Sequence, residues 1–158
     1  MNEPHTLILG LGNPLRADDS FGWRLADELA KAELPVGVEV IAYHQLTPEL
    51  AEMLRGVALV IFLDVEIGVP PGVVRSVPVT PALRQAQDNA TSAEAFSHQL
   101  NPAALLALTR QLYGQAPAAY AVSVGAADLG YGTALSDTVE AALPEALEAV
   151  VALLRRIT

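Results

Sequence analysis

The sequence contains no cysteine among its 158 residues. This excludes disulfide bonds, a thiolate nucleophile and a thiolate metal site. Long hydrophobic runs are also missing, because the longest uninterrupted apolar stretch, residues 57–63, is far too short to cross a bilayer. The N-terminal residues MNEPHTLILG show neither the basic segment nor the long apolar segment of a signal peptide. We therefore expect a cytoplasmic protein that does not act at a membrane.

Basic residues are scarce as well. Nine Lys and Arg stand against 18 Asp and Glu, which gives a net charge of −9 that is spread along the chain. Nucleic acids and anionic membranes are bound through patches of Lys and Arg, so we expect no nucleic acid and no membrane among the partners. The apolar content of 52% is enough for a sizeable core, and the length is that of one domain, spanning residues 1–158.

Short apolar runs alternate with helical patterns along the chain. Strands are expected at 6–10, 38–43, 57–63, 72–77 and 118–124, and the fourth reads as a weaker, antiparallel edge strand. Helices are expected at about 19–32, 47–54 and 101–114 and from Asp137 onward, with Asp137 and Glu140 at capping-box spacing. Residues 84–97 read as a loop or a marginal helix. This order predicts an α/β fold: a single three-layer domain with a mostly parallel twisted sheet of about five strands and helices on both faces.

The stretch GLGNPLRADDSFG, residues 10–22, resembles a glycine-rich phosphate loop between a strand and a helix. The third glycine of the dinucleotide fingerprint is replaced by Leu15, and Asp18 and Asp19 stand where a phosphate would sit at the helix N-terminus. Two carboxylates there repel phosphate. We therefore interpret the glycines as allowing a tight strand-to-helix turn. Asp18 or Ser20 is expected to cap the helix, which leaves one aspartate to point into the crevice at the sheet edge.

Two further residues are candidate ligands for a cation. Asp64 follows the apolar run 57–63, where a carboxylate is desolvated unless it meets a proton, a partner or a metal. It could also be an ordinary turn or cap aspartate, and Glu66 is a weaker candidate beside it. His98 lies before the helix expected at 101–114 and could equally be a surface histidine. If Asp19, Asp64 and His98 meet at the carboxyl edge of the sheet, they suit a divalent ion with open coordination positions.

Four segments in order resemble the hydrogenase maturation endopeptidases. They are GLGNPLRADDSFG (10–22), VIFLDVEIG (60–68), FSHQLNPAALL (96–106) and VSVGAADLGYGTALSDTVEAALPEALEAV (122–150). The resemblance implies an endopeptidase that removes a C-terminal extension from the precursor of a nickel–iron hydrogenase large subunit after nickel insertion. It also implies that Asp19, Asp64 and His98 contact the nickel, which the substrate carries; another divalent ion can occupy the site in vitro.

The chain departs from that family's pattern at two places. Asp19 stands where many members have a glutamate, and Tyr43-His44-Gln45-Leu46-Thr47 replaces a D-G-G-T-like segment. His44 would lie at the same sheet edge as the metal group, so His44 and Asp18 are additional candidates for the site. The role of His44 is open between contacting metal or substrate and lining the cleft.

The chemistry leaves three functions to compare. Without cysteine or a G-x-S-x-G elbow, an acyl-enzyme is not expected, whereas a metal could polarise the scissile carbonyl or activate water. A non-catalytic nickel- or precursor-binding maturation factor would use the same three ligands. A peptidyl-tRNA hydrolase is suggested by LGLGNP (9–14) alone, but the T-R-H-N continuation is missing and the acidic charge is unsuited to tRNA.

Overall fold

A five-stranded sheet forms the centre of the fold. The computed structural model describes residues 5–82 and 100–157. The strands are β1 (Thr6–Leu11), β2 (Val38–Tyr43), β3 (Leu59–Glu66), β4 (Val74–Pro78) and β5 (Ala118–Gly125), in the spatial order β2-β1-β3-β5-β4. All neighbouring strands are parallel except β4, which runs antiparallel to β5 at the edge. The predicted mostly parallel sheet with an antiparallel edge strand is confirmed.

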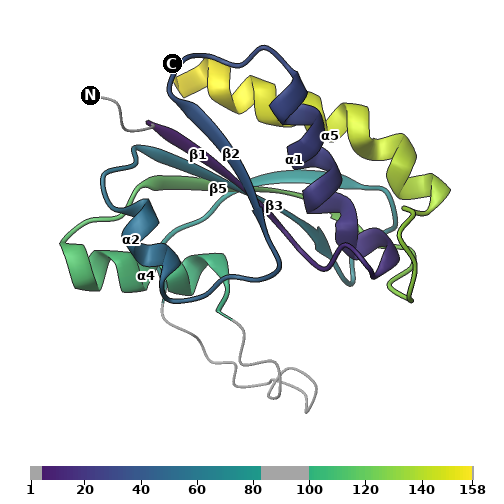
Figure 1. The fold of residues 1–158 in the computed structure, drawn as a ribbon, viewed down its shortest axis with the longest axis horizontal. Coiled ribbons are helices and arrows are strands. Elements are labelled where there is room, and N and C mark those ends of the chain that lie inside the picture. Colours follow the sequence, from purple (N-terminus) through teal and green to yellow (C-terminus); the bar gives the residue numbers. More distant parts are fainter. Residues whose placement is uncertain (1–4, 83–99, 158) are drawn as a thin grey trace.

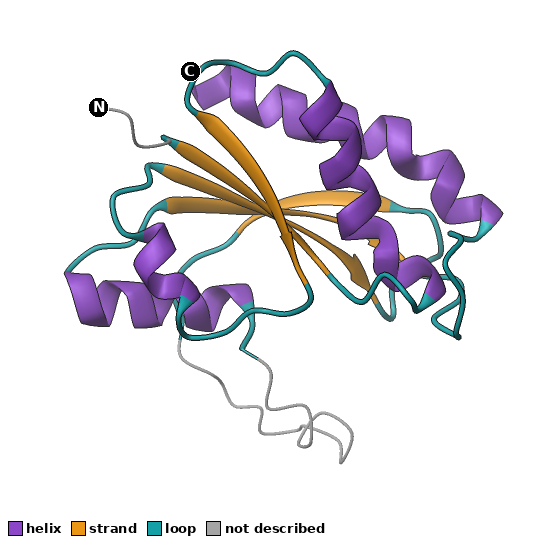
Figure 2. Cartoon of the chain, in the orientation of Figure 1, coloured by secondary structure: helices purple, strands orange, loops and turns teal. Residues whose placement is uncertain are grey.

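Helices cover both faces of this sheet (Figure 1). They are a 3-10 turn, η1 (Ala17–Ser20), followed by α1 (Phe21–Lys31), α2 (Leu50–Leu54), α4 (Pro102–Tyr113) and α5 (Asp137–Ile157). Figure 2 shows α1 and α5 on one face and α2 and α4 on the other, which gives the three expected layers. Helix α5 continues past Pro144 to Ile157. No helix in the described ranges is long and apolar enough to cross a membrane.

The alternation of side chains along the strands divides the core into two parts. Ile8, Ile61 and Leu63 are fully or almost fully buried against α1 and α5. Leu7 and Phe62 point to the other face and pack with residues of α2 and α4. The central strands are buried on both faces, and this explains why their sequences are nearly uninterrupted apolar runs.

The cap of α4 agrees with the sequence, whereas the starts of α2 and α5 differ from it. Asn101 Oδ1 accepts a hydrogen bond from the N–H of Ala104 at 2.8 Å, as expected for an N-cap residue. Thr47 makes no such cap: its carbonyl accepts the N–H of Leu50 in a turn, so α2 begins three residues later than predicted. Helix α5 is capped by the hydroxyl of Ser136, which accepts the N–H of Val139 at 3.3 Å, rather than by Asp137.

Strand β3 is displaced along the sequence relative to the prediction. It begins at Leu59 and continues to Glu66, so Asp64 lies within the strand and not just after it. Because side chains alternate along a strand, Asp64 and Glu66 share the face of the sheet on which Phe62 lies.

Two glycines of the 10–22 motif bring α1 unusually close to the sheet. A Cβ atom on Gly22, in the first turn of α1, would overlap backbone atoms of Leu11 in β1 and Leu63 in β3. A Cβ on Gly10 would overlap the carbonyl group of Gly22. The motif glycines therefore permit close packing between helix and strands as well as the turn that the sequence predicted.

Candidate functional site

The order of the strands creates a crevice between the carboxyl ends of β1 and β3. Strand β1 leads through α1 to β2 on one side, whereas β3 leads to β4 and β5 on the other side. Such a switch point is where open α/β sheets bind ligands. Gly10 pairs with Leu63 in the register of β1 and β3, so Asp64 lies level with the last residue of β1, Leu11.

A cavity of about 580 Å³ opens at this switch point. Four segments that are distant in the sequence line it. They are the turn after β1 (Gly12, Asn13, Arg16 and Asp19), the segment after β2 (His44, Gln45 and Leu46), Asp64 of β3, and the start of α4 (Leu100, Asn101 and Pro102), together with Leu11. The structure thus brings Asp19 and Asp64 to one cavity, as the sequence analysis required for a shared cation site.

Asp19 is held in place by its own turn. Its Oδ2 accepts the N–H of Asn13 at 2.8 Å, and its N–H donates to the carbonyl of Arg16 at 2.9 Å. Gly12 has φ +132°, and a Cβ there would overlap the Asp19 carbonyl oxygen. Burial raises the pKa of Asp19 above its usual value, and it outweighs the opposing effects of the Asn13 N–H and of the charges on Arg16 and His44.

Asp64 is the most perturbed acid of the site. Burial, together with the negative charges of Asp19 and Glu66, raises its pKa to about 7, although the N–H of Val65 donates to Oδ1 at 2.8 Å. Two carboxylates compete here for one poorly solvated space, and a proton or a cation between them would relieve their repulsion. Groups with strongly raised pKa values in a cleft are typical of functional sites.

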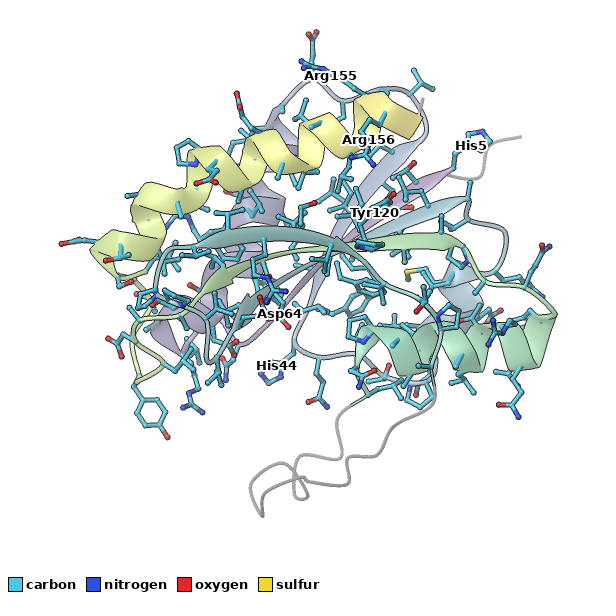
Figure 3. All side chains as sticks on the ribbon, turned by 180° about the vertical axis from the view of Figure 1, so that it is seen from behind. His5, His44, Asp64, Tyr120, Arg155 and Arg156 are labelled. Atoms are coloured by element: carbon cyan, nitrogen blue, oxygen red, sulfur yellow. The ribbon has the colours of Figure 1, made fainter. Side chains whose placement is uncertain are left out.

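His44 and Arg16 contribute positive or potentially positive charge to the same cavity. Both line it, and both act on Asp19 through their charge. Figure 3 shows His44 and Asp64 toward the same end of the sheet, away from His5, which precedes β1. Arg16 is held by its surroundings: its Nε and Nη2 donate to the carbonyl of Leu129 at 3.1 and 2.9 Å, and its guanidinium stands 5.8 Å from the Tyr131 ring centroid. Arg16 was not among the residues expected at the site, although it is the one cation of the 10–22 motif.

Asp18 does not line the cavity, and its carboxylate points elsewhere. It is fully buried, and the donors of its hydrogen bonds all lie in the segment between β5 and α5. Oδ2 accepts the N–H groups of Ala127 and Asp128, both at 2.8 Å, and the Ser136 hydroxyl at 2.9 Å, while Oδ1 accepts the Ser136 N–H at 2.7 Å. Burial alone would raise the pKa of Asp18, but these donors together hold it below the usual value.

The expectation that Asp18 or Ser20 caps α1 is therefore wrong. Neither η1 nor α1 has a side-chain cap, and the Ser20 hydroxyl donates to the carbonyl of Ala17 at 2.7 Å. The reason is the intervening 3-10 turn, which turns Asp18 away from the N-terminus of α1 and toward the later segment.

Glu66 is engaged by neighbours on its own face of the sheet. Its carboxylate accepts the Ser123 hydroxyl at 2.8 Å and forms an ion pair with Arg75 at 3.1 Å. It contributes charge to the surroundings of Asp64 without lining the cavity.

His98 and the segment 84–97 lie outside the described residues. Within residues 5–82 and 100–157, no group of three or more His, Asp or Glu is arranged to hold a metal ion. The described part of the site therefore supplies two carboxylates, from Asp19 and Asp64. Oxygen donors of this kind suit a divalent cation whose other coordination positions are filled from elsewhere.

Known structures share this architecture over almost the whole chain. Neither the family models nor the curated proteins gave a match. Among solved structures, the hydrogenase maturating endopeptidase HybD from E. coli is 26% identical, with a TM-score of 0.76 over 96% of this chain and 93% of that one. A solution structure of an endopeptidase from Escherichia coli is 27% identical, with a TM-score of 0.74 over 96% and 93% of the two chains.

An archaeal structure gives the same result. The hydrogenase 2 maturation peptidase from a Thaumarchaeota archaeon is 26% identical, with a TM-score of 0.69 over 95% of this chain and 97% of that one. In the present chain, the motifs 10–22 and 60–68 contribute Asp19 and Asp64, respectively, to the lining of the cavity. In fold and in these motifs, the chain is similar to solved hydrogenase maturation endopeptidases.

Proposed function

We propose that this protein is an endopeptidase that removes the C-terminal extension from a nickel–iron hydrogenase large-subunit precursor after nickel has been inserted. The observation that carries the proposal is the meeting of Asp19 and Asp64 at one cavity, at the switch point of a sheet with this family's fold. The nickel arrives with the substrate, and Asp19 and Asp64 complete its coordination. We include His98 as the third ligand on the resemblance of the 96–106 segment to the family.

The properties of the two carboxylates support this chemistry. Burial raises the pKa of both carboxylates, so the site favours a partner that neutralises their charge. A nickel-loaded precursor supplies such a charge, whereas a nickel-free precursor does not, so the site can discriminate between them.

The direct test is incubation of the purified protein with nickel-loaded and nickel-free precursor, followed by mass measurement. We expect only the nickel-loaded precursor to lose the mass of its extension. Asp19→Asn and Asp64→Asn should each lower the rate by about 100-fold or more, the range of a lost acid–base or ligand group. Asp27→Asn is the matched control, because Asp27 is 63% exposed on α1 and pairs only with Lys31 in the described structure.

Three outcomes would contradict the proposal. Binding of the loaded precursor without any change of mass would identify a non-catalytic nickel- or precursor-binding factor. Equal cleavage of the nickel-free precursor would exclude nickel as the recognition element. Release of the peptide from peptidyl-tRNA, with no action on the precursor, would point to the third function considered from the sequence.

A further inference from the structure

The buried carboxylate of Asp18 joins two segments that are more than 100 residues apart in the sequence. All four hydrogen bonds that it accepts come from Ala127, Asp128 and Ser136. These donors belong to the segment between β5 and α5, which the proposed chemistry does not use. Burying a charged carboxylate completely is unfavourable in free energy unless hydrogen bonds replace its contacts with water, so the position of Asp18 requires an explanation.

Backbone hydrogen bonds reinforce the same junction. The N–H of Asp18 donates to the carbonyl of Asp128 at 2.9 Å, and the N–H of Ala17 donates to that of Gly132 at 2.8 Å. In return, the N–H of Gly132 donates to the carbonyl of Leu15 at 3.0 Å. We call residues 15–18 and 127–136, held together in this way, the clasp.

The clasp stabilises a turn that would not hold its shape by itself. Ala17 has φ +48°, and it is the one residue other than glycine with a positive φ in the described ranges. Left-handed backbone is unfavourable for a residue with a Cβ, so it persists where the surroundings impose it. Here the surroundings are the hydrogen bonds of Ala17 and Asp18 across the clasp. Asp19, the next residue, takes its direction from this turn.

We propose that Asp18 is a positioning residue: by fixing the turn 15–18 to the segment 127–136, it aims the carboxylate of Asp19 into the cavity. The effect on catalysis rests on the proposed function, whereas the effect on the geometry of Asp19 does not. The segment after β5 thus takes part in the site without lining it. Asp18 itself contacts neither substrate nor metal.

The charge of Asp18 is essential to this role. Both of its oxygens accept hydrogen bonds from N–H groups, so an asparagine of the same shape would direct an NH₂ group at one or more of these donors. Asp18→Asn should therefore loosen the clasp while changing the side-chain volume very little. The turn can then relax at Ala17, and Asp19 loses its direction.

The first test reports on the geometry and needs no enzymatic activity. The N–H of Asn13 donates to Asp19 Oδ2, and Asn13 has no hydrogen bond to Asp18 in the described structure. Amide hydrogen exchange at Asn13 should become at least about tenfold faster in Asp18→Asn, because the hydrogen bond opens when Asp19 is displaced. Val150→Ala is the control. It shortens a fully buried side chain of α5 and so destabilises the fold, but Val150 is not part of the clasp.

The second test separates positioning from stability. With nickel-loaded precursor, well below the melting temperatures of all variants, Asp18→Asn should lower kcat about 100-fold, the effect of displacing a reacting group by about 1 Å. KM should change less than about threefold, and Val150→Ala should keep kcat. If Asp18→Asn does not fold, Ser136→Ala removes one of the four hydrogen bonds to Asp18, together with the α5 cap, and should give a smaller change in the same direction. Val150→Ala controls for the accompanying loss of α5 stability.

The proposal is overturned if Asn13 exchanges at the wild-type rate in Asp18→Asn or Ser136→Ala, or if Val150→Ala accelerates that exchange equally. It is also overturned if Asp18→Asn retains kcat within about threefold of the wild type. A wild-type protein that does not cleave the precursor refutes the proposed function alone, because the exchange measurement still decides the role of Asp18.

Discussion

Asp64→Asn is expected to make the protein more stable, and increasingly so as the pH rises. The wild-type carboxyl has a pKa of about 7 in the folded protein, against a usual value of 3.8. When the folded pKa of an acid is raised, the folded state loses stability as the pH rises from the unfolded to the folded pKa. A difference of about three pKa units corresponds to roughly 4 kcal/mol above pH 7. Asparagine has no charge and escapes this cost.

The size of this stabilisation depends on the pH. The free energy of unfolding of Asp64→Asn should exceed that of the wild type by about 1 kcal/mol at pH 4.5 and by about 4 kcal/mol at pH 8.5. The Val65 N–H, which donates to Asp64 Oδ1, keeps an acceptor in the amide. With a urea dependence of about 2 kcal/mol/M, the unfolding midpoint should move up by about 2 M at pH 8.5.

Urea unfolding followed by circular dichroism at pH 4.5, 6, 7 and 8.5 measures this difference. Subtracting the two curves removes the pH dependence of every other group, and Asp27→Asn supplies the exposed control. A stability difference between Asp64→Asn and wild type that stays constant between pH 4.5 and 8.5 would refute the reasoning that burial and the neighbouring Asp19 raise this pKa. The measured gain would show that Asp64 serves the site at the expense of stability.

Three further results are expected. The affinity for free Ni²⁺, measured by isothermal titration calorimetry, should rise by up to about tenfold for each unit by which the pH increases toward 7, because the ion displaces the proton of Asp64. Above pH 7 the affinity should level off. An affinity independent of pH would exclude Asp64 as a ligand. Gly22→Ala should destabilise the fold by about 3 kcal/mol, since its Cβ would overlap backbone of β1 and β3, and a thermal midpoint equal to wild type would contradict that packing. Asn101→Ala should cost about 1 kcal/mol through loss of the α4 cap, measured by urea unfolding, whereas Ala103→Ser nearby should change little; equal stability of Asn101→Ala and wild type would contradict the capping role.

Much of the fold could be predicted from local patterns. The apolar runs and helical periodicities locate all five strands and the helices, and Asn101-Pro102 predicts the start of α4 because capping depends on neighbours within a few residues. The charge of the 10–22 motif already argues against a phosphate ligand, and the position of Asp64 after an apolar run already marks it as a candidate. His98 stays a prediction, since it lies outside the described residues.

Local patterns failed where distant segments decide the outcome. Asp18 stands where a helix-capping residue is expected, yet its carboxylate accepts hydrogen bonds from donors 109 to 118 residues away. No pattern in the sequence specifies these partners, because they meet only when β5 and α5 pack beside the turn after β1. The starts of α2 and β3 moved by two or three residues for a related reason, since turns and strand pairing set these bounds.

The sequence by itself determined the α/β class, the tight glycine turn and the acidic character of the region that follows β1. Only the tertiary structure decided that β1 and β3 are neighbours at the switch point, with Asp19 and Asp64 at one cavity. It also decided the pKa of Asp64, which depends on burial and on a carboxylate 45 residues earlier in the chain. The physical reason is range: backbone preferences and capping act over a few residues, whereas desolvation and the repulsion of two carboxylates depend on which segments the packed sheet brings together.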